Sequence, residues 1–186
     1  IDNDTPRPAV FAGESLGADP KGSAAYNAAW SAWLAALDDY LVQHQLEDKV
    51  YYYVQNEPQD QADYDTAAAL LKLTKAAAPH LKCAVSEEPK PEIAEHVVYG
   101  TPDGSSYDIW IADVQHFNQA YAAERQGRGE DVWFYHNDGT PAPYIKPIDF
   151  ALQGSHQRML AWLCWRYRAR GWGYYKCSIF YPGGKP

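Results

Sequence analysis

The sequence contains few cysteines and no long apolar run, and these two shortages narrow the class of protein. Its 186 residues include only Cys83, Cys164 and Cys177, which are too few and too far apart for a disulfide framework or for paired zinc ligands. No stretch approaches the roughly 18 apolar residues of a membrane span, so we expect no membrane partner. The first residues, Ile1 to Asp4, lack the basic and apolar regions of a signal peptide, so we expect no signal segment within this chain.

Positive charge is also scarce. Sixteen Lys and Arg stand against 24 Asp and Glu, which gives a formal net charge of −8. No cluster of Lys and Arg resembles the surface with which nucleic-acid-binding proteins neutralise phosphates, so nucleic acid is excluded as an expected partner. The sequence indicates neither a metal site nor an organic cofactor.

Aromatic residues, in contrast, are abundant, with seven Trp and fifteen Tyr. Aromatic rings form platforms for the apolar side of pyranose rings in sugar-binding clefts, but large hydrophobic cores collect them as well. Composition alone favours the core. In particular, Trp30, Trp33, Trp162 and Trp165 have the helical spacing of core-facing residues, so packing accounts for them without a role in binding.

Helical and strand-like segments alternate along the chain. The predicted helices span residues 24–45, 66–78, 92–98, 117–125 and 150–170, and the predicted strands span residues 49–54, 81–85, 108–112, 131–135 and 172–180. This alternation predicts an α/β fold in which parallel strands are joined by crossover helices. No Gly-rich nucleotide fingerprint follows a strand, which weakens the interpretation as a doubly wound nucleotide-binding sheet.

The length of the chain decides how much of a barrel it could contain. A complete (β/α)8 TIM-type barrel needs about 250 residues and eight strands. We therefore expect one domain over residues 1–186 that holds only the later strands of such a barrel. An upstream segment or a second copy would complete it, because an open half-barrel exposes strand edges and apolar faces.

The clearest chemical signal is the run Val54-Gln55-Asn56-Glu57-Pro58, at the end of a predicted strand. In barrel enzymes the carboxyl ends of the strands carry the active site. Glycoside hydrolysis needs a carboxylic acid that protonates the departing oxygen, and Glu57 is placed for that role. Asn56 could bind a sugar hydroxyl or acetamido group, although Asn and Glu before Pro also cap ordinary turns. The catalytic interpretation requires that Glu57 face an aromatic-walled cavity.

A second carboxylate would have to come from another strand end. Glu87 and Glu88 follow one predicted strand, Asp113 follows the next, and Asp138 follows the strand Trp133-Phe134-Tyr135. Each could be a nucleophile or base, but for any one of them taken singly a solvated loop charge is the favoured interpretation. The sequence does not rank them.

The predicted substrate contacts are residues on or beside the strands. The set comprises Tyr53, Glu88, His116, Trp133, Tyr135, His136, Asn137, Trp172 and Tyr174. Because alternate side chains of a barrel strand point inward, only some of the aromatic residues among them could form the floor of a sugar site. A lone His is more often structural than functional, so the two His residues carry little weight by themselves.

Several of these segments occur in an order that resembles a known family. Leu37 to Leu41 with His44, Tyr51 to Val54, Glu57-Pro58, Trp133 to Tyr135, and Arg158 to Trp162 before Gly171 are similar to the C-terminal barrel region of glycoside hydrolase family 123, the β-N-acetylgalactosaminidases, and to the related domain of unknown function 4091. The likeness spans roughly residues 30–181.

The resemblance implies substrate-assisted catalysis, in which an Asp-Glu pair acts together with the substrate's own acetamido group. The family's general acid corresponds to Glu57, and the Asp that orients the acetamido nitrogen corresponds to Asn56. Asn lacks the negative charge of that Asp, although other N-acetylhexosaminidases use Asn there in an imidic-acid form. The Asn-Glu-Pro string also resembles the acid/base turn of the retaining clan that includes cellulases, but that clan's nucleophilic Glu has no counterpart in the run from Trp133 to Gly139.

The sequence therefore predicts a glycosidase that acts on an oligo- or polysaccharide, including one that contains N-acetylhexosamine. The resemblance implies a bacterial extracellular or periplasmic protein. One alternative is a non-catalytic, degenerate barrel that binds carbohydrate, in which the change from Asp to Asn marks the loss of activity. Another is an open-sheet α/β protein that binds a small molecule.

Overall fold

The computed structural model describes residues 10–11, 14–15, 22–93, 106–137, 139–147 and 153–175. The chain forms two compact units, one of residues 1–85 and 91–108 and the other of residues 86–90 and 109–186. The hydrogen-bonded strand order is β3-β4-β5-β6-β7 in one sheet, with β1 and β2 in a separate two-stranded sheet. The two units are described in turn below.

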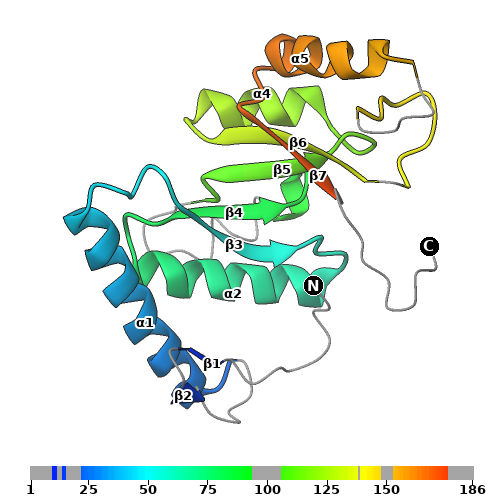
Figure 1. The fold of residues 1–186 in the computed structure, drawn as a ribbon. Coiled ribbons are helices and arrows are strands. Elements are labelled where there is room, and N and C mark those ends of the chain that lie inside the picture. Colours follow the sequence, from blue (N-terminus) through cyan, green and yellow to red (C-terminus); the bar gives the residue numbers. More distant parts are fainter. Residues whose placement is uncertain are drawn as a thin grey trace, which may run out of the picture. The chain divides into compact units, whose positions relative to one another are not determined.

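The first unit begins with the short antiparallel strands β1 (Val10–Phe11) and β2 (Glu14–Ser15). It continues with α1 (Ala24–Gln43), β3 (Tyr51–Asn56), α2 (Gln61–Ala77) and β4 (Lys82–Ser86) (Figure 1). The structure confirms three predicted elements, with each end within two residues of the prediction. They are the helix over residues 24–45 and the strands over residues 49–54 and 81–85.

Helix α2 begins five residues earlier than predicted. The polar segment from Gln59 to Asp65 was expected to be a loop, but the helix starts at Gln61. The side chain of Asp60 accepts a hydrogen bond from the Asp63 backbone N–H at 3.1 Å and so caps the first turn. The prediction relied on apolar periodicity, which is absent from an exposed, capped first turn.

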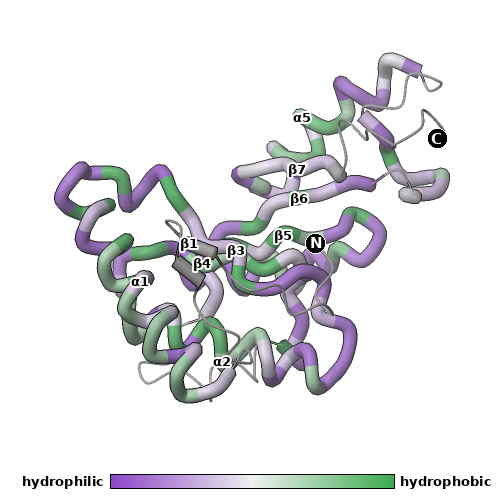
Figure 2. The backbone as a smooth tube through the Cα atoms, turned by 60° about the horizontal axis from the view of Figure 1, so that its bottom comes forward, coloured by the Kyte–Doolittle hydropathy of each residue, from purple (hydrophilic) through white to green (hydrophobic). Residues whose placement is uncertain are grey.

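The core of the first unit lies where α1 meets the following segments. Leu34, Leu41, Ala78 and Leu81 form its buried cluster, and Trp30, Trp33, Leu37, Val50, Tyr52 and Ala77 pack against it. The rings of Trp30 and Trp33 stack with their centroids 4.6 Å apart, which confirms the predicted packing role of both residues. Hydrophobic residues accordingly predominate along α1 (Figure 2).

The second unit contains β5 (Ile109–Asp113), α4 (Gln119–Gly127), β6 (Asp131–Asn137), α5 (Ser155–Tyr167) and β7 (Gly171–Tyr175). The strands β5, β6 and β7 pair in parallel, with Asp113 opposite Tyr135 and Asn137 opposite Tyr175. Helices that alternate with parallel strands confirm the α/β fold, whereas closure into a barrel stays a prediction. Some predicted elements lie partly outside the described residues. These parts include residues 94–98 of the helix predicted over residues 92–98 and residues 176–180 of the strand predicted over residues 172–180.

Side chains of β5 and β6 alternate between two faces of the sheet. Phe134 packs edge-on against Phe117, at 4.8 Å between ring centroids, and against Tyr167 of α5 at 6.1 Å. Likewise, Trp110 lies under the guanidinium group of Arg125 in α4. The even-numbered residues of these strands therefore face the helices of the unit. The register places their odd-numbered residues on the opposite face.

Helix α5 corrects one prediction about packing. Trp162 and Trp165 were expected to face the core, but they are 64% and 75% exposed, and no residue of α5 is buried. Tyr167 is the aromatic residue of this helix that contacts the sheet residue Phe134. Both sides of α5 are apolar, so helical spacing alone could not tell which side contacts the sheet.

Within the described parts of the chain, no helix combines the length and the apolar character needed to cross a membrane.

Candidate active site

The end of β3 presents the residues that carried the catalytic prediction. Tyr53 donates a hydrogen bond from its hydroxyl to Oδ1 of Asn56 at 2.8 Å. Both residues are half-buried, and the next two residues are Glu57 and the buried Pro58. The structure therefore brings Tyr53 and Asn56 together, and it places Glu57 directly after the carboxyl end of a strand.

The backbone of Glu57 has an uncommon conformation. Its φ is 41°, in the left-handed region that residues other than glycine rarely adopt. Its carbonyl oxygen accepts a hydrogen bond from Nε2 of Gln59 at 2.9 Å, which supports the turn. Strained backbone of this kind is concentrated at functional sites. Glu57 is nevertheless exposed, so the enclosed position expected for it is not found.

Two adjacent carboxylates follow β4 and lie in the second unit. The side chains of Glu87 and Glu88 are 9% and 14% exposed, and Nζ of Lys90 lies 3.0 Å from Glu87 and 3.4 Å from Glu88. Burial, together with the hydrogen bond to Glu88, raises the pKa of Glu87 to about 8. Burial acts in the same direction on Glu88, but hydrogen bonds with Glu87 and with its own backbone, together with the nearby Lys90, outweigh it and lower the pKa of Glu88. The pair therefore shares one proton at neutral pH.

Asp113 ends β5 on the face of the sheet that is opposite the helices. The residue is buried, and its Oδ2 accepts a hydrogen bond from Nδ2 of Asn137 at 3.3 Å. Its Oδ1 accepts one from the backbone N–H of Gln115 at 2.8 Å. The predicted site residue Asn137 thus directly contacts a candidate second carboxylate.

Two aromatic residues of β6, Trp133 and Tyr135, lie on the same face as Asp113 and Asn137. Opposite them in β7 stand Gly171 and Gly173. A Cβ at Gly171 would lie 2.6 Å from Cε2 of Trp133, which is closer than real contacts allow. Glycine is therefore needed at position 171 because the indole of Trp133 lies over its backbone.

His136, Trp172 and Tyr174 do not share that face. Nε1 of Trp172 donates a hydrogen bond to Nδ1 of the fully buried His136 at 2.7 Å, and the ring of Tyr174 lies 6.1 Å from that of Trp172. Burial lowers the pKa of His136 to about 4, so its ring is neutral at pH 7. By register, all three lie on the side of Phe134, which faces the helices. The structure thus divides the predicted rim residues of β6 and β7 between two faces.

The other predicted residues have varied positions. His116 is exposed in the turn after β5, where its backbone N–H donates to the carbonyl oxygen of Asp113 at 3.0 Å. Asp138 lies outside the described residues. Sequence reasoning missed Gln115 and Lys90, which contact the candidate carboxylates. The position of each within three residues of a carboxylate was the available signal.

In the part of the chain that the structure describes, no three side chains of His, Cys, Asp or Glu gather closely enough to hold a metal ion.

The fold and these strand ends define a class of protein. Parallel strands joined by helices place their active sites at the carboxyl ends of the strands, where this chain has its carboxyl and amide side chains. A family model described as the catalytic domain of glycoside hydrolase 123 matches residues 14–178, and the chain belongs to this family. The resemblance found in the sequence is thereby confirmed. No curated protein shows a significant match to the sequence.

Proposed function

We propose that this chain is the catalytic region of a glycosidase that hydrolyses an oligo- or polysaccharide, with Glu57 as general acid and base. The cavity that the sequence interpretation required around Glu57 is not found among the described residues, so this role rests on the position of Glu57 at the end of β3 and on the family match. The observation that carries the proposal is the position of Glu57 at the carboxyl end of β3 in a chain matched by a glycoside hydrolase catalytic model. Its left-handed φ of 41° is a second support, because strained backbone persists where function requires it.

Asn56 orients the substrate in this proposal. Its side-chain amide can donate and accept hydrogen bonds, and the 2.8 Å contact from Tyr53 fixes the direction of Oδ1. Tyr53 is then a positioning residue that acts through Asn56. An amide held in this way suits the acetamido group of an N-acetylhexosamine, so we include such sugars among the expected substrates.

The reaction would proceed in two steps. The acetamido oxygen of the substrate attacks the anomeric carbon, the glycosidic bond breaks, and Glu57 gives its proton to the departing oxygen. Glu57 then takes a proton from water, whose oxygen bonds to the anomeric carbon and opens the cyclic intermediate. The substrate's own amide serves as nucleophile, so no second carboxylate has to bond to the sugar.

On the sheet face that carries Asp113, the second unit offers a separate group of sugar-binding side chains. Trp133 supplies an indole, and Tyr135 and Asn137 supply polar groups beside it. Aromatic faces and neutral hydrogen-bonding groups are the usual chemistry of sugar recognition. We therefore retain these three as substrate contacts, and Glu88 and His116 with them as strand-end residues.

A second candidate function rests on the exposure of Glu57. An exposed carboxyl group lacks the enclosed surroundings expected of a general acid, and Asn stands at position 56 where the resemblance implies Asp. These features favour a non-catalytic domain that binds carbohydrate without cleaving it.

Release of nitrophenol from a panel of aryl glycosides, including N-acetylhexosaminides, tests the first candidate. We expect turnover by the wild type and a loss of at least about 100-fold in Glu57→Gln, the scale of general acid catalysis. Glu92→Gln, a change at another exposed glutamate of the same unit, serves as the matched control and should keep full activity.

Two results would contradict the assignment of Glu57. Equal turnover by wild type and Glu57→Gln would show that another residue is the general acid. Binding of oligosaccharides by both proteins, with no turnover by either on any glycoside, would favour the carbohydrate-binding domain.

A further inference from the structure

Helix α5 carries an uncovered aromatic face. Met159, Trp162 and Trp165 are 44%, 64% and 75% exposed, and their spacing of three residues places them along one side of the helix. The two indole rings meet edge to face, with centroids 6.3 Å apart and planes at 88°. Large aromatic residues exposed together on a surface mark an interaction site more often than a chance arrangement.

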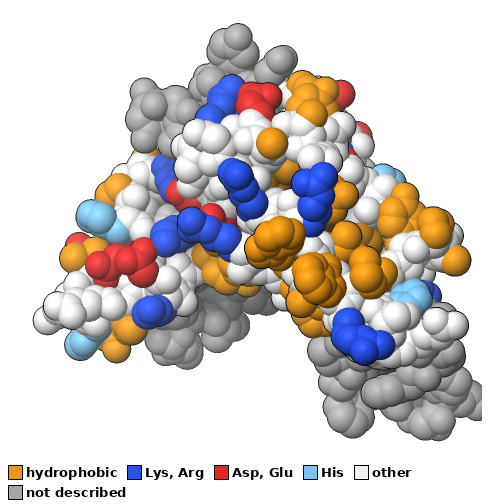
Figure 3. All heavy atoms as spheres, turned by 90° about the horizontal axis from the view of Figure 1, so that it is seen from above, with side chains coloured by type: hydrophobic (Ala, Val, Ile, Leu, Met, Phe, Trp, Pro, Cys, Tyr) orange, Lys and Arg blue, Asp and Glu red, His pale blue; other side chains and the backbone are white. Residues whose placement is uncertain are grey.

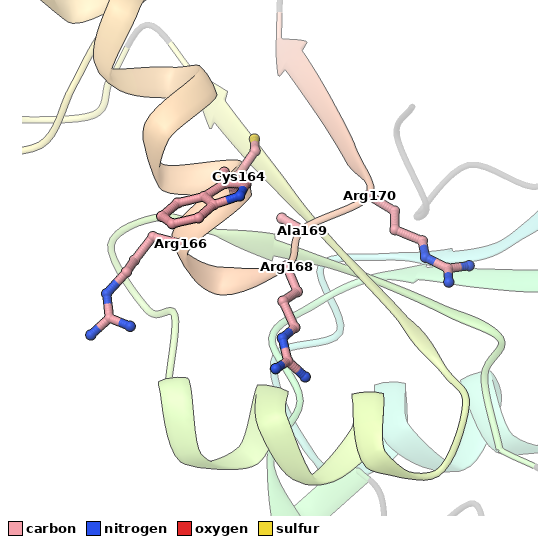
Figure 4. Close-up of a pocket in the computed structure, with 6 residues that line it drawn as sticks. Cys164, Arg166, Arg168, Ala169 and Arg170 are labelled. Carbon is pink, nitrogen blue, oxygen red and sulfur yellow. The ribbon is translucent and has the colours of Figure 1, made fainter.

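Cations surround the same end of the helix. Trp165, Arg166, Arg168 and Arg170, with Cys164 and Ala169, line a surface hollow of about 580 Å³ (Figure 4). Arg166 lies over the ring of Tyr167 at 6.0 Å, and Arg170 pairs with Asp131 at 3.2 Å while its side chain remains 76% exposed. Viewed from the side on which α5 lies in Figure 1, the surface shows hydrophobic side chains next to Lys and Arg side chains (Figure 3).

The charge of this region is opposite to that of the chain as a whole. The described residues 153–175 contain four Arg and no Asp or Glu, although the whole chain has a formal charge of −8. A second copy that paired α5 against α5 would place arginines opposite arginines, which like-charge repulsion disfavours. An anionic partner is therefore the complementary one.

We propose that the α5 face, defined as Trp162, Trp165, Arg166 and Arg168, binds an anionic saccharide chain bearing carboxylate or sulfate groups. Guanidinium groups pair with the planar oxygens of carboxylate and with sulfate through two parallel hydrogen bonds. Exposed indoles supply the flat apolar surface on which pyranose rings stack. The choice of a saccharide rests on the proposed glycosidase function, whereas the anionic character rests on the arginines alone.

Binding of three polysaccharides to the full chain tests the proposal, by isothermal titration calorimetry. The probes are polygalacturonate, dextran sulfate and neutral dextran, and the first two distinguish carboxylate from sulfate as the recognised group. We expect at least one anionic chain to bind, neutral dextran to bind at least tenfold more weakly, and the affinity to fall as salt rises, because salt screens exposed charges.

Variants distinguish binding by the α5 face from a general effect of the protein's net charge. Trp165→Ala and the double change Arg166→Gln with Arg168→Gln should each weaken binding at least tenfold. Arg128→Gln removes a comparably exposed arginine from α4, where it pairs with Glu124, and should leave binding unchanged. All these side chains are exposed, so the folded structure should persist, which circular dichroism checks.

Four outcomes would overturn the proposal. The first is no binding of either anionic chain, and the second is an equal loss in Arg128→Gln. The third is a change of oligomeric state in Trp165→Ala, which would mean that protein covers the face. A single-stranded oligonucleotide that bound more tightly than both polysaccharides would also overturn the choice of saccharide. Hydrolysis of small aryl glycosides should be unaffected by the α5 variants and lost in Glu57→Gln, so the two proposals fail separately.

Discussion

At the residue scale, the proton shared by Glu87 and Glu88 makes stability depend on pH. The folded pKa of Glu87, about 8, lies above its ordinary value near 4.5. Because the folded protein holds the Glu87 proton more tightly than the unfolded chain does, the protonated side chain favours the folded state. This stabilisation is complete below pH 4.5 and is lost as pH rises through about 8. We therefore expect the wild type to lose stability relative to Glu87→Gln between about pH 5 and pH 8, measured by urea unfolding at each pH.

Glu88 acts in the opposite direction and in a different range. Its lowered pKa adds stability that disappears only as pH falls below the ordinary glutamate range, so it does not mask the effect of Glu87. Glu124→Gln is the control, because that residue is 51% exposed in its pair with Arg128 and should show no such trend. Parallel stability curves for wild type and Glu87→Gln would show that Glu87 is ionised in the folded protein.

At the element scale, the packing of β7 on β6 depends on two glycines that stand opposite aromatic residues. An added methyl at Gly171 overlaps the indole of Trp133, whereas at Gly173 the nearest atom, Cβ of Tyr135, is 3.8 Å away. We expect Gly171→Ala to cost about 1–3 kcal/mol of unfolding free energy, the usual range for overpacking. Gly173→Ala is the matched control in the same strand, and chemical denaturation measures both.

Displacement of the Trp133 indole should also show whether this residue binds substrate. If Trp133 contacts substrate, Gly171→Ala should raise KM as well as lower stability, while Gly173→Ala should leave KM nearly unchanged. Equal stabilities for the two variants would show that Trp133 can turn aside at no cost, and the close approach would then not constrain the sheet.

At the scale of the whole molecule, the strand order ends at β3 on one side and at β7 on the other. Among the described residues no further strand pairs with either, and open edges favour association with other strands. We therefore expect this chain, prepared by itself, to self-associate as its concentration rises. Sedimentation velocity across a range of concentrations checks this. A single monomeric species throughout would contradict it.

Much of the architecture could be predicted from the sequence because it depends on local pattern. An aromatic and β-branched run that ends in a Pro-containing turn gave β3, the alternation of elements gave β4, and apolar periodicity gave α1. The start of α2 was wrong because the cap at Asp60 leaves no apolar signal. Trp162 and Trp165 were wrong because α5 is apolar on both sides, and contact with the sheet decides which side is covered.

The sequence by itself determined the alternation of strands and helices, the family, and the placing of Asn56 and Glu57 at a strand end. Only the tertiary structure decided which side chains share a face. Trp133 and His136 are three residues apart on β6, yet strand alternation and helix packing send them to opposite sides of the sheet. Hydrogen bonding likewise separates the pKa values of Glu87 and Glu88, which are neighbours of identical chemistry. Burial raises both, whereas the bond between them raises one and lowers the other, and this geometry depends on the fold.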